Sequence, residues 1–164
     1  MHNQYLIPLI AALIGVLLKL SYFRWFYPDP EFDNYVRFGY LLLLLLSVFL
    51  SLRFYAMTIK KTEFGTMVKE GMKSVSIFAL ILSGFTYLYY EVINPEYFAG
   101  RISDVASQVK QMPNSEQAVK TAEFVFNSFT HTTITLVGIM VAGFFYVLIL
   151  ALIQRSSPGF LRNL

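Results

Sequence analysis

The 164 residues contain no cysteine, and charged side chains are scarce. Without cysteine the chain can form no disulfide framework, no thiolate metal site and no cysteine nucleophile. Asp, Glu, Lys and Arg make up 14% of the chain, against about 25% in a typical soluble domain. Hydrophobic residues make up 56% and aromatic residues 17%. This composition is typical of a protein whose surface faces lipid.

Motifs with catalytic or nucleotide-binding spacing are also missing. The sequence has no HExxH pair, Walker loop, GxSxG elbow or Rossmann fingerprint. The two histidines, His2 and His131, are expected on opposite sides of a membrane. We therefore expect no enzyme activity, no metal, no cofactor and no identifiable small-molecule substrate. The net charge of +3 comes from basic residues near membrane segments, which favours anionic lipid over nucleic acid as their partner.

Four apolar runs are each long enough to cross a bilayer, which takes about 20 residues for about 30 Å of hydrocarbon. We place the spans near residues 4–23, 38–56, 72–93 and 130–153. The first run lacks the basic start and cleavage site of a secretory signal, so we expect an uncleaved helix. The expected fold class is an all-α membrane protein, with four transmembrane helices in a single domain over residues 1–164.

Basic residues predict the orientation, because cytoplasmic loops are enriched in Lys and Arg. One side of the membrane carries Arg53, Lys60, Lys61, Lys69, Lys73, Arg155 and Arg162. The other carries Arg24, Arg37, Arg101, Lys110 and Lys120, spread over many more residues. We therefore expect both termini in the cytoplasm. The aromatic run 22–27 and the tyrosines Tyr87, Tyr89 and Tyr90 would then form an outer aromatic belt.

Residues 94–129 are expected to form an extracytoplasmic hairpin of two helices. Asn94, Pro95 and Glu96 each suit a helix start, and Pro113 would end this first helix. Asn114 or Ser115 can cap the second helix, with Gln117 completing a capping-box-like start. With no breaker before the fourth span, the second helix is expected to continue straight into it.

Each of these two helices carries one apolar stripe, made of Phe98, Ile102, Val105, Val109 and Met112 on the first, and Val119, Ala122, Phe126 and Phe129 on the second. In one interpretation the two stripes pack on each other as the seam of a hairpin. In the other, part of the seam docks on a partner protein or lies on the membrane surface.

Two shorter connections complete the layout. The acidic stretch 28–33, with two prolines, is expected to be a rigid connection rather than a site. The basic connection 58–74 contains Gly65 and Gly71, which suggest bends between the membrane surface and the third span.

Three ionisable residues lie near the outer ends of spans, where such groups are candidates for function. Lys19 can place its ammonium among lipid headgroups, or it can form an ion pair with Glu91. Glu91 itself precedes a polar break and is expected to be exposed. His131 lies in a polar helical turn, which favours a hydrogen-bonded structural histidine, with a proton relay as the alternative.

Small residues four positions apart occur in the first and fourth spans, as Ala11 with Gly15 and Gly138 with Ala142. Such pairs let two helix backbones approach closely. They can pack the four helices into one bundle, or one pair can bind a helix of another membrane protein.

The layout resembles a known family. A basic link from Phe64-Gly65 to Gly71-Met72-Lys73, an aromatic segment containing Asn94-Pro95, an outer helical stretch and a last span closing on Gln154-Arg155 are similar to the domain of unknown function 4199 family, found mainly in Bacteroidota. The resemblance implies a bacterial inner-membrane location and no catalytic residues. The acidic first loop and Lys19 depart from the family pattern.

Together these features predict a non-catalytic accessory or scaffolding subunit of a larger inner-membrane complex. Its partners would be the lipid bilayer and other integral membrane proteins. The alternative is a small homo-oligomeric transporter or channel component, which would need a polar route across the bilayer.

Overall fold

The structure is a computed structural model that describes residues 3–59, 63–110, 114–157 and 160–163. Five residues used in the sequence analysis, His2, Lys60, Lys61, Met112 and Pro113, lie outside this part of the chain. Within the described ranges all regular structure is helical and no strand occurs.

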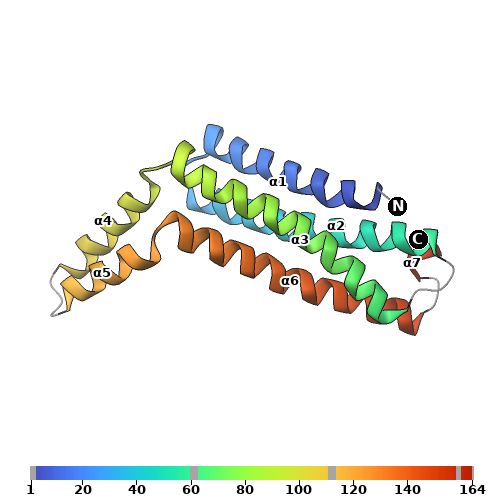
Figure 1. The fold of residues 1–164 in the computed structure, drawn as a ribbon. Helices are drawn as coiled ribbons and strands as arrows, with labels where there is room; N and C mark the ends of the chain where they lie inside the picture. The colour runs from blue at the N-terminus through green and yellow to red at the C-terminus, as the bar shows by residue number, and fades with distance from the viewer. Residues whose placement is uncertain (1–2, 60–62, 111–113, 158–159, 164) are drawn as a thin grey trace. The chain divides into compact units, whose positions relative to one another are not determined.

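The helices follow one another as η1 Asn3–Tyr5, α1 Leu6–Trp25, α2 Pro30–Thr58, α3 Phe64–Leu88, η2 Tyr89–Ile93, α4 Tyr97–Val109, α5 Ser115–Val125, α6 Ser128–Ser156 and α7 Phe160–Asn163 (Figure 1). Four helical stretches are long and apolar enough to cross a membrane: Leu6–Trp25, Phe32–Thr58, Phe64–Ile93 and Ser128–Ser156. The expected all-helical class with four candidate spans is therefore confirmed, and the chain is a multi-pass membrane protein.

The helices form two compact units. Unit 1 comprises Met1–Leu82 together with Gly138–Leu164, and unit 2 comprises Ser83–Val137. Helices α3 and α6 each contribute residues to both units.

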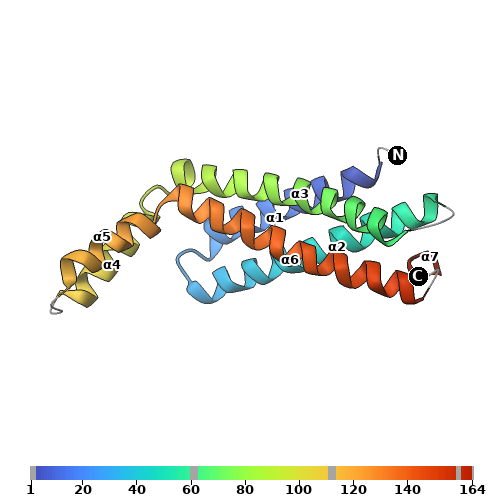
Figure 2. The same ribbon diagram turned by 60° about the horizontal axis from the view of Figure 1, so that its bottom comes forward.

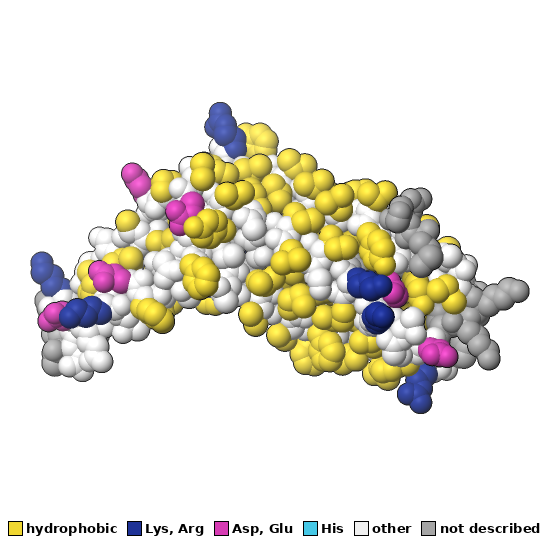
Figure 3. All heavy atoms as spheres, viewed as in Figure 1, with side chains coloured by type: hydrophobic (Ala, Val, Ile, Leu, Met, Phe, Trp, Pro, Cys, Tyr) yellow, Lys and Arg dark blue, Asp and Glu magenta, His cyan; other side chains and the backbone are white. Residues whose placement is uncertain are grey.

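In unit 1, α1 and α2 run antiparallel and side by side (Figures 1 and 2). The interior is apolar, and its completely buried side chains include Ala12, Leu44, Val75, Phe78 and Val147. Hydrophobic side chains are also spread widely over the face seen in Figure 3, as expected of helices surrounded by lipid.

Glycines bring α3 and α6 close together. A Cβ atom added at Gly71 would lie 2.7 Å from Cγ2 of Val147, and one added at Gly143 would overlap the side chain of Val75. The expected bends at Gly65 and Gly71 are wrong, because α3 runs unbroken from Phe64 through both residues. Gly71 is needed for close packing rather than for a turn.

The two ends of α2 also differ from expectation. The helix begins at Pro30, so most of the acidic connection belongs to its first turns. Proline suits a first helical position because the backbone N–H that it lacks would have no intrahelical acceptor there. At the other end, the short helix α7 packs on α2. Leu161 of α7 is completely buried, and its backbone N–H donates to Oε1 of Gln154 at 2.9 Å.

In unit 2, α4 and α5 contact each other. The predicted helix start at Asn94 is wrong, because Asn94 ends the π-helical turn η2 and α4 begins at Tyr97. Asn94 donates its backbone N–H to the carbonyl of Tyr89 at 2.8 Å, so it satisfies the end of one helix instead of capping the next. The helix start at Asn114 and Ser115 is confirmed in position, although no side chain caps it.

The junction between α5 and α6 is broken rather than continuous. Phe126 has φ −89° and ψ 79°, which ends α5 at Val125. The side chain of Asn127 then bonds to both helices at the junction. Its Nδ2 donates to the carbonyl of Phe124 on α5 at 2.7 Å, and its Oδ1 accepts the backbone N–H of Thr130 on α6 at 2.8 Å. Asn127 therefore caps α6, and the predicted uninterrupted helix is wrong.

Candidate functional site

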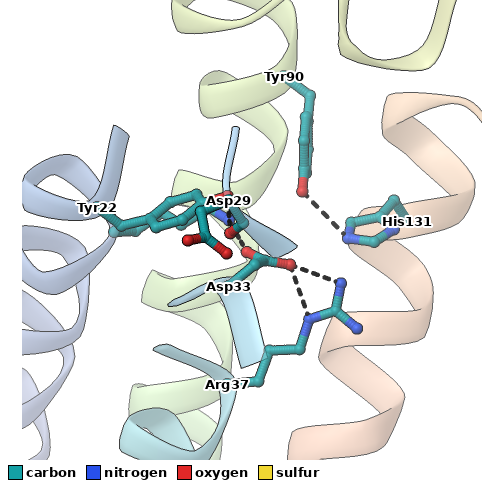
Figure 4. Close-up of polar contacts among 7 residues, drawn as sticks. Tyr22, Asp29, Asp33, Arg37, Tyr90 and His131 are labelled. Carbon is teal, nitrogen blue, oxygen red and sulfur yellow. Dashed lines mark hydrogen bonds and ion pairs between the residues drawn. The ribbon is translucent and has the colours of Figure 1, made fainter. Parts of the chain in front are cut away.

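The first polar cluster joins α1 to α2 around Asp33. Lys19 Nζ lies 2.6 Å from Asp33 Oδ1. Figure 4 shows Arg37 on the other oxygen of the same carboxylate: it donates to Asp33 Oδ2 from Nε at 3.1 Å and from Nη2 at 2.8 Å. The Lys19 and Asp33 side chains are only 12% and 16% exposed. Close by, Tyr22 donates its hydroxyl to the carbonyl of Asp29 at 3.1 Å. A charge inside a membrane segment is tolerated when it is paired in this way.

This arrangement changes the interpretation of Lys19. Its ammonium was expected among headgroups, but the side chain is mostly covered and bonded to a carboxylate in the stretch that we interpreted as a rigid connection. The ammonium also lies 4.8 Å from the centroid of the Tyr22 ring, a distance at which a cation is attracted to the ring face. Glu91 is exposed and belongs to unit 2, and its ion pair with Lys19 stays a prediction.

The second cluster holds the N-terminal segment on α3 through Glu70. The Glu70 Oε2 accepts from Gln4 Nε2 and from the Tyr5 hydroxyl, both at 3.1 Å. Its Oε1 lies 2.6 Å from Lys73 Nζ. The carboxylate therefore has a partner for each oxygen, and the contacts tie η1 to the first turns of α3.

Three buried serines extend the Glu70 cluster into the bundle. Ser74 Oγ lies 3.2 Å from Ser47 Oγ and 3.1 Å from Ser51 Oγ, and Ser51 also donates to the carbonyl of Gln4 at 3.4 Å. Hydroxyls of this kind bridge neighbouring membrane helices. Sequence reasoning missed this cluster, although Ser47 and Ser51, four positions apart in a leucine-rich span, were the available signal.

Buried apolar side chains flank two of these serines along their own helices. Leu44 lies three positions before Ser47 on α2, and Phe78 lies four positions after Ser74 on α3, so each is about one turn away. Both side chains are completely buried.

The third cluster lies in unit 2 around His131. The hydroxyl of Tyr90 and the Nε2 of His131 are 3.4 Å apart (Figure 4), and the two rings meet edge to face with centroids 5.0 Å apart. Phe98 packs on the same imidazole at 5.8 Å. The hydrogen-bonded structural histidine expected from the sequence is present, while this contact does not test the proton relay.

The same cluster corrects the aromatic belt. Tyr89 and Tyr90 are 1% and 5% exposed, so they belong to the interior of unit 2 rather than to its surface. Of Tyr87, Tyr89 and Tyr90, only Tyr87 faces outward, with 42% exposure. In the run 22–27, Tyr22 is buried, whereas Trp25, Phe26 and Tyr27 are exposed.

The two pairs of small residues have different surroundings. Ala11 and Gly15 are buried, and a Cβ added at Gly15 would lie 3.1 Å from Cδ1 of Leu82, so this pair packs unit 1 itself. Gly138 is exposed, and an added Cβ would meet nothing within 4 Å. Ala142, one turn later, is half-buried.

The residues expected in the α4–α5 seam are covered to different degrees. Phe98 is buried against His131, and the half-buried positions are Ile102, Val105, Val109, Val119 and Phe126. Helices α4 and α5 contact each other. Packing of the two stripes on each other and docking of part of the seam on a partner or on the membrane surface both stay predictions.

Each of the three clusters joins separate chain segments, so its visible role is to fix helix positions. Among the described residues no group of three His, Asp or Glu side chains is placed to hold a metal ion. Comparison with protein-family models, curated proteins and solved structures finds no match to this chain. The resemblance to the domain of unknown function 4199 family therefore stays a prediction.

Proposed function

We propose that the protein is a non-catalytic accessory or scaffolding subunit that binds another integral membrane protein of a larger assembly through α6. The observation that carries this proposal is the open surface at Gly138. Gly15, Gly71 and Gly143 each make room for a neighbour within the chain, whereas among the described residues no neighbouring side chain or other helix lies within 4 Å of a Cβ added at Gly138. A membrane helix that leaves its backbone uncovered in this way suits close approach of a second helix.

The surface next to Gly138 forms a continuous stripe, which we call the α6 stripe. It consists of residues three or four positions apart: Gly138, Ala142, Phe145, Ile149 and Leu152. The last three side chains are 56%, 54% and 49% exposed. Small residues at one end and large ones at the other allow a partner helix to cross closely at Gly138 and to pack on bulky side chains further along.

The packing of unit 1 supports this proposal over the transporter alternative. A conduit through one copy would need polar groups across the whole bundle. The Glu70 cluster occupies one part of unit 1, but Leu44 and Phe78, about one turn from its serines on α2 and α3, are apolar and completely buried.

The proposal includes a location in a bacterial inner membrane with both termini in the cytoplasm and the α4–α5 pair outside. The basic residues around α3 support this orientation. The chain has no cysteine, so single cysteines can be introduced without background. An impermeant maleimide should label Gln108→Cys on α4 in intact cells and should leave Lys69→Cys on α3 unlabelled until the cells are opened; the reverse pattern would overturn the orientation.

The partner is tested with Gly138→Leu, which fills the open space. Extraction in a mild detergent should recover other membrane proteins with the natural chain and lose them with Gly138→Leu. Phe144→Leu is the matched control, because Phe144 is 42% exposed on the same helix and lies six positions from Gly138, about a third of a turn away from the stripe. If the natural chain migrates alone, or if both variants keep the same co-purifying proteins, the proposal is wrong.

A further inference from the structure

Two phenylalanines in unit 2 are among the most exposed apolar side chains of the described protein. Phe124 on α5 is 79% exposed and Phe129 on α6 is 73% exposed. Phe129 lies inside a candidate span, but Phe124 lies before it, on a helix too polar and too short to cross a membrane. The other exposed side chains of α5 are mostly polar: Glu116, Gln117, Lys120, Thr121 and Glu123.

The position of Phe124 relative to the start of α6 is fixed by hydrogen bonds. Its carbonyl accepts from Asn127 Nδ2 at 2.7 Å and from Thr130 Oγ1 at 3.4 Å. Asn127 in turn accepts the backbone N–H of Thr130 at 2.8 Å. The backbone of Phe124 is therefore held against the first turn of the span that contains Phe129.

This first turn belongs at the boundary between hydrocarbon and water. Helix α6 has 29 residues and so is about 40 Å long at about 1.5 Å per residue, whereas the hydrocarbon layer is about 30 Å thick. The polar side chains of Thr130, His131, Thr132 and Thr133 lie in the first two turns. Trp and Tyr are enriched at this depth of the bilayer, and phenylalanine is buried there by helices that lie in the interface.

We infer that Phe124 and Phe129 insert into the interfacial layer of the bilayer and anchor the α4–α5 pair at the membrane surface. The occupant that we assign to this surface is lipid rather than protein, because Phe129 is an exposed apolar side chain of a candidate membrane span and the carbonyl of Phe124 is bonded to that span's first turn. The anchor explains why an otherwise polar helix exposes a phenylalanine. It does not depend on a partner at the α6 stripe.

The test uses tryptophan fluorescence, since the chain has a single tryptophan. Trp25→Phe supplies a background without tryptophan, into which Phe124→Trp, Phe129→Trp or Gln108→Trp is introduced. Gln108 is exposed near the C-terminal end of α4, and Gln108→Trp serves as the comparison position that we expect in water. The purified full chain is reconstituted into phosphatidylcholine and phosphatidylglycerol vesicles, with and without lipids brominated near the headgroup. Circular dichroism checks that each variant keeps its helix content.

The expected result is loss of fluorescence from Phe124→Trp and Phe129→Trp in brominated vesicles, with little quenching of either by aqueous iodide. Gln108→Trp should show the opposite pattern. Quenching of Phe124→Trp by iodide alone would place position 124 in water and overturn the inference. Protection of Phe124→Trp from both quenchers would also overturn it, because protein, such as a second copy of the chain, would then cover the site.

Discussion

Lys19 and Asp33 form an ion pair between α1 and α2, with Nζ and Oδ1 2.6 Å apart. Both residues belong to segments apolar enough to cross a membrane. Either charge alone would be costly inside a membrane segment, because the cost of desolvation would not be offset by a partner. The pair therefore fixes the position of α2 relative to α1 at the end where their connection lies.

Asp33→Asn should destabilise the protein by about 3 kcal/mol, since removing one member of a covered ion pair leaves the other charge without its partner. Thermal unfolding in detergent measures this loss. Lys19→Met combined with Asp33→Asn should recover part of the stability, because the uncompensated ammonium is then absent.

Arg37→Gln is the matched control for Asp33→Asn. Arg37 also binds Asp33, but its side chain is 60% exposed, and an exposed pair of this kind contributes about 0.5 kcal/mol. If Asp33→Asn and Arg37→Gln lowered the stability equally, the assignment of Lys19 as the important partner of Asp33 would be wrong.

Gly143→Ala should destabilise the fold, and Gly138→Ala should not, although the two glycines lie on the same helix. The new Cβ at position 143 overlaps the stiff, β-branched Val75, so α3 and α6 must move apart at a cost of about 1–3 kcal/mol. At position 138 the Cβ meets nothing, and alanine favours the helix by up to about 1 kcal/mol. Melting temperatures of the isolated protein measure the difference. If Gly138→Ala lowered the melting temperature more than Gly143→Ala, α6 would pack within the chain through Gly138 instead.

Hydropathy was sufficient to predict the four spans because a membrane helix must satisfy its own backbone hydrogen bonds and cover them with apolar side chains. The amphipathic stripes of α4 and α5 were likewise visible at helical spacing. The exact ends of the helices could not be predicted, because a helix can extend beyond the apolar run. Helix α2 begins at Pro30 and α3 at Phe64, each before its apolar run.

The polar contacts were less accessible to sequence reasoning, because they join residues that are far apart in the chain. Gln4 and Glu70 are 66 positions apart, and nothing in the local pattern links them. The sequence indicated Lys19 as a candidate polar residue. It did not indicate Asp33 as its partner, because Asp33 lies in a stretch with two prolines that we interpreted as a rigid connection. The role of Asn127 was missed for a different reason: a single polar residue between two helical patterns does not show whether the helix continues or is capped.

Glu70→Leu should loosen the N-terminal segment while leaving the bundle assembled. The substitution removes the acceptor of Gln4 Nε2, of the Tyr5 hydroxyl and of Lys73. Hydrogen bonds to a charged group contribute about 1.5–3 kcal/mol, so exchange of the amide hydrogens at the start of α1 should accelerate by about tenfold or more.

Hydrogen–deuterium exchange by mass spectrometry measures this change. Glu63→Leu removes a nearby exposed carboxylate and should leave exchange at the start of α1 unchanged. If both variants exchange alike, the Glu70 cluster does not hold the N-terminal segment in place.

Asn127→Ala should weaken the junction between α5 and α6 by about 1 kcal/mol, because the first turn of α6 loses its cap and the carbonyl of Phe124 loses a donor. Asn127→Asp keeps an oxygen that can accept from Thr130 but cannot donate to Phe124, so its effect should be smaller. Amide exchange at residues 128–131 should follow the order Ala, Asp, Asn from fastest to slowest. Slower exchange in Asn127→Ala than in the natural chain would mean that alanine joins α5 and α6 into one continuous helix, and that Asn127 serves to interrupt a helix rather than to cap one.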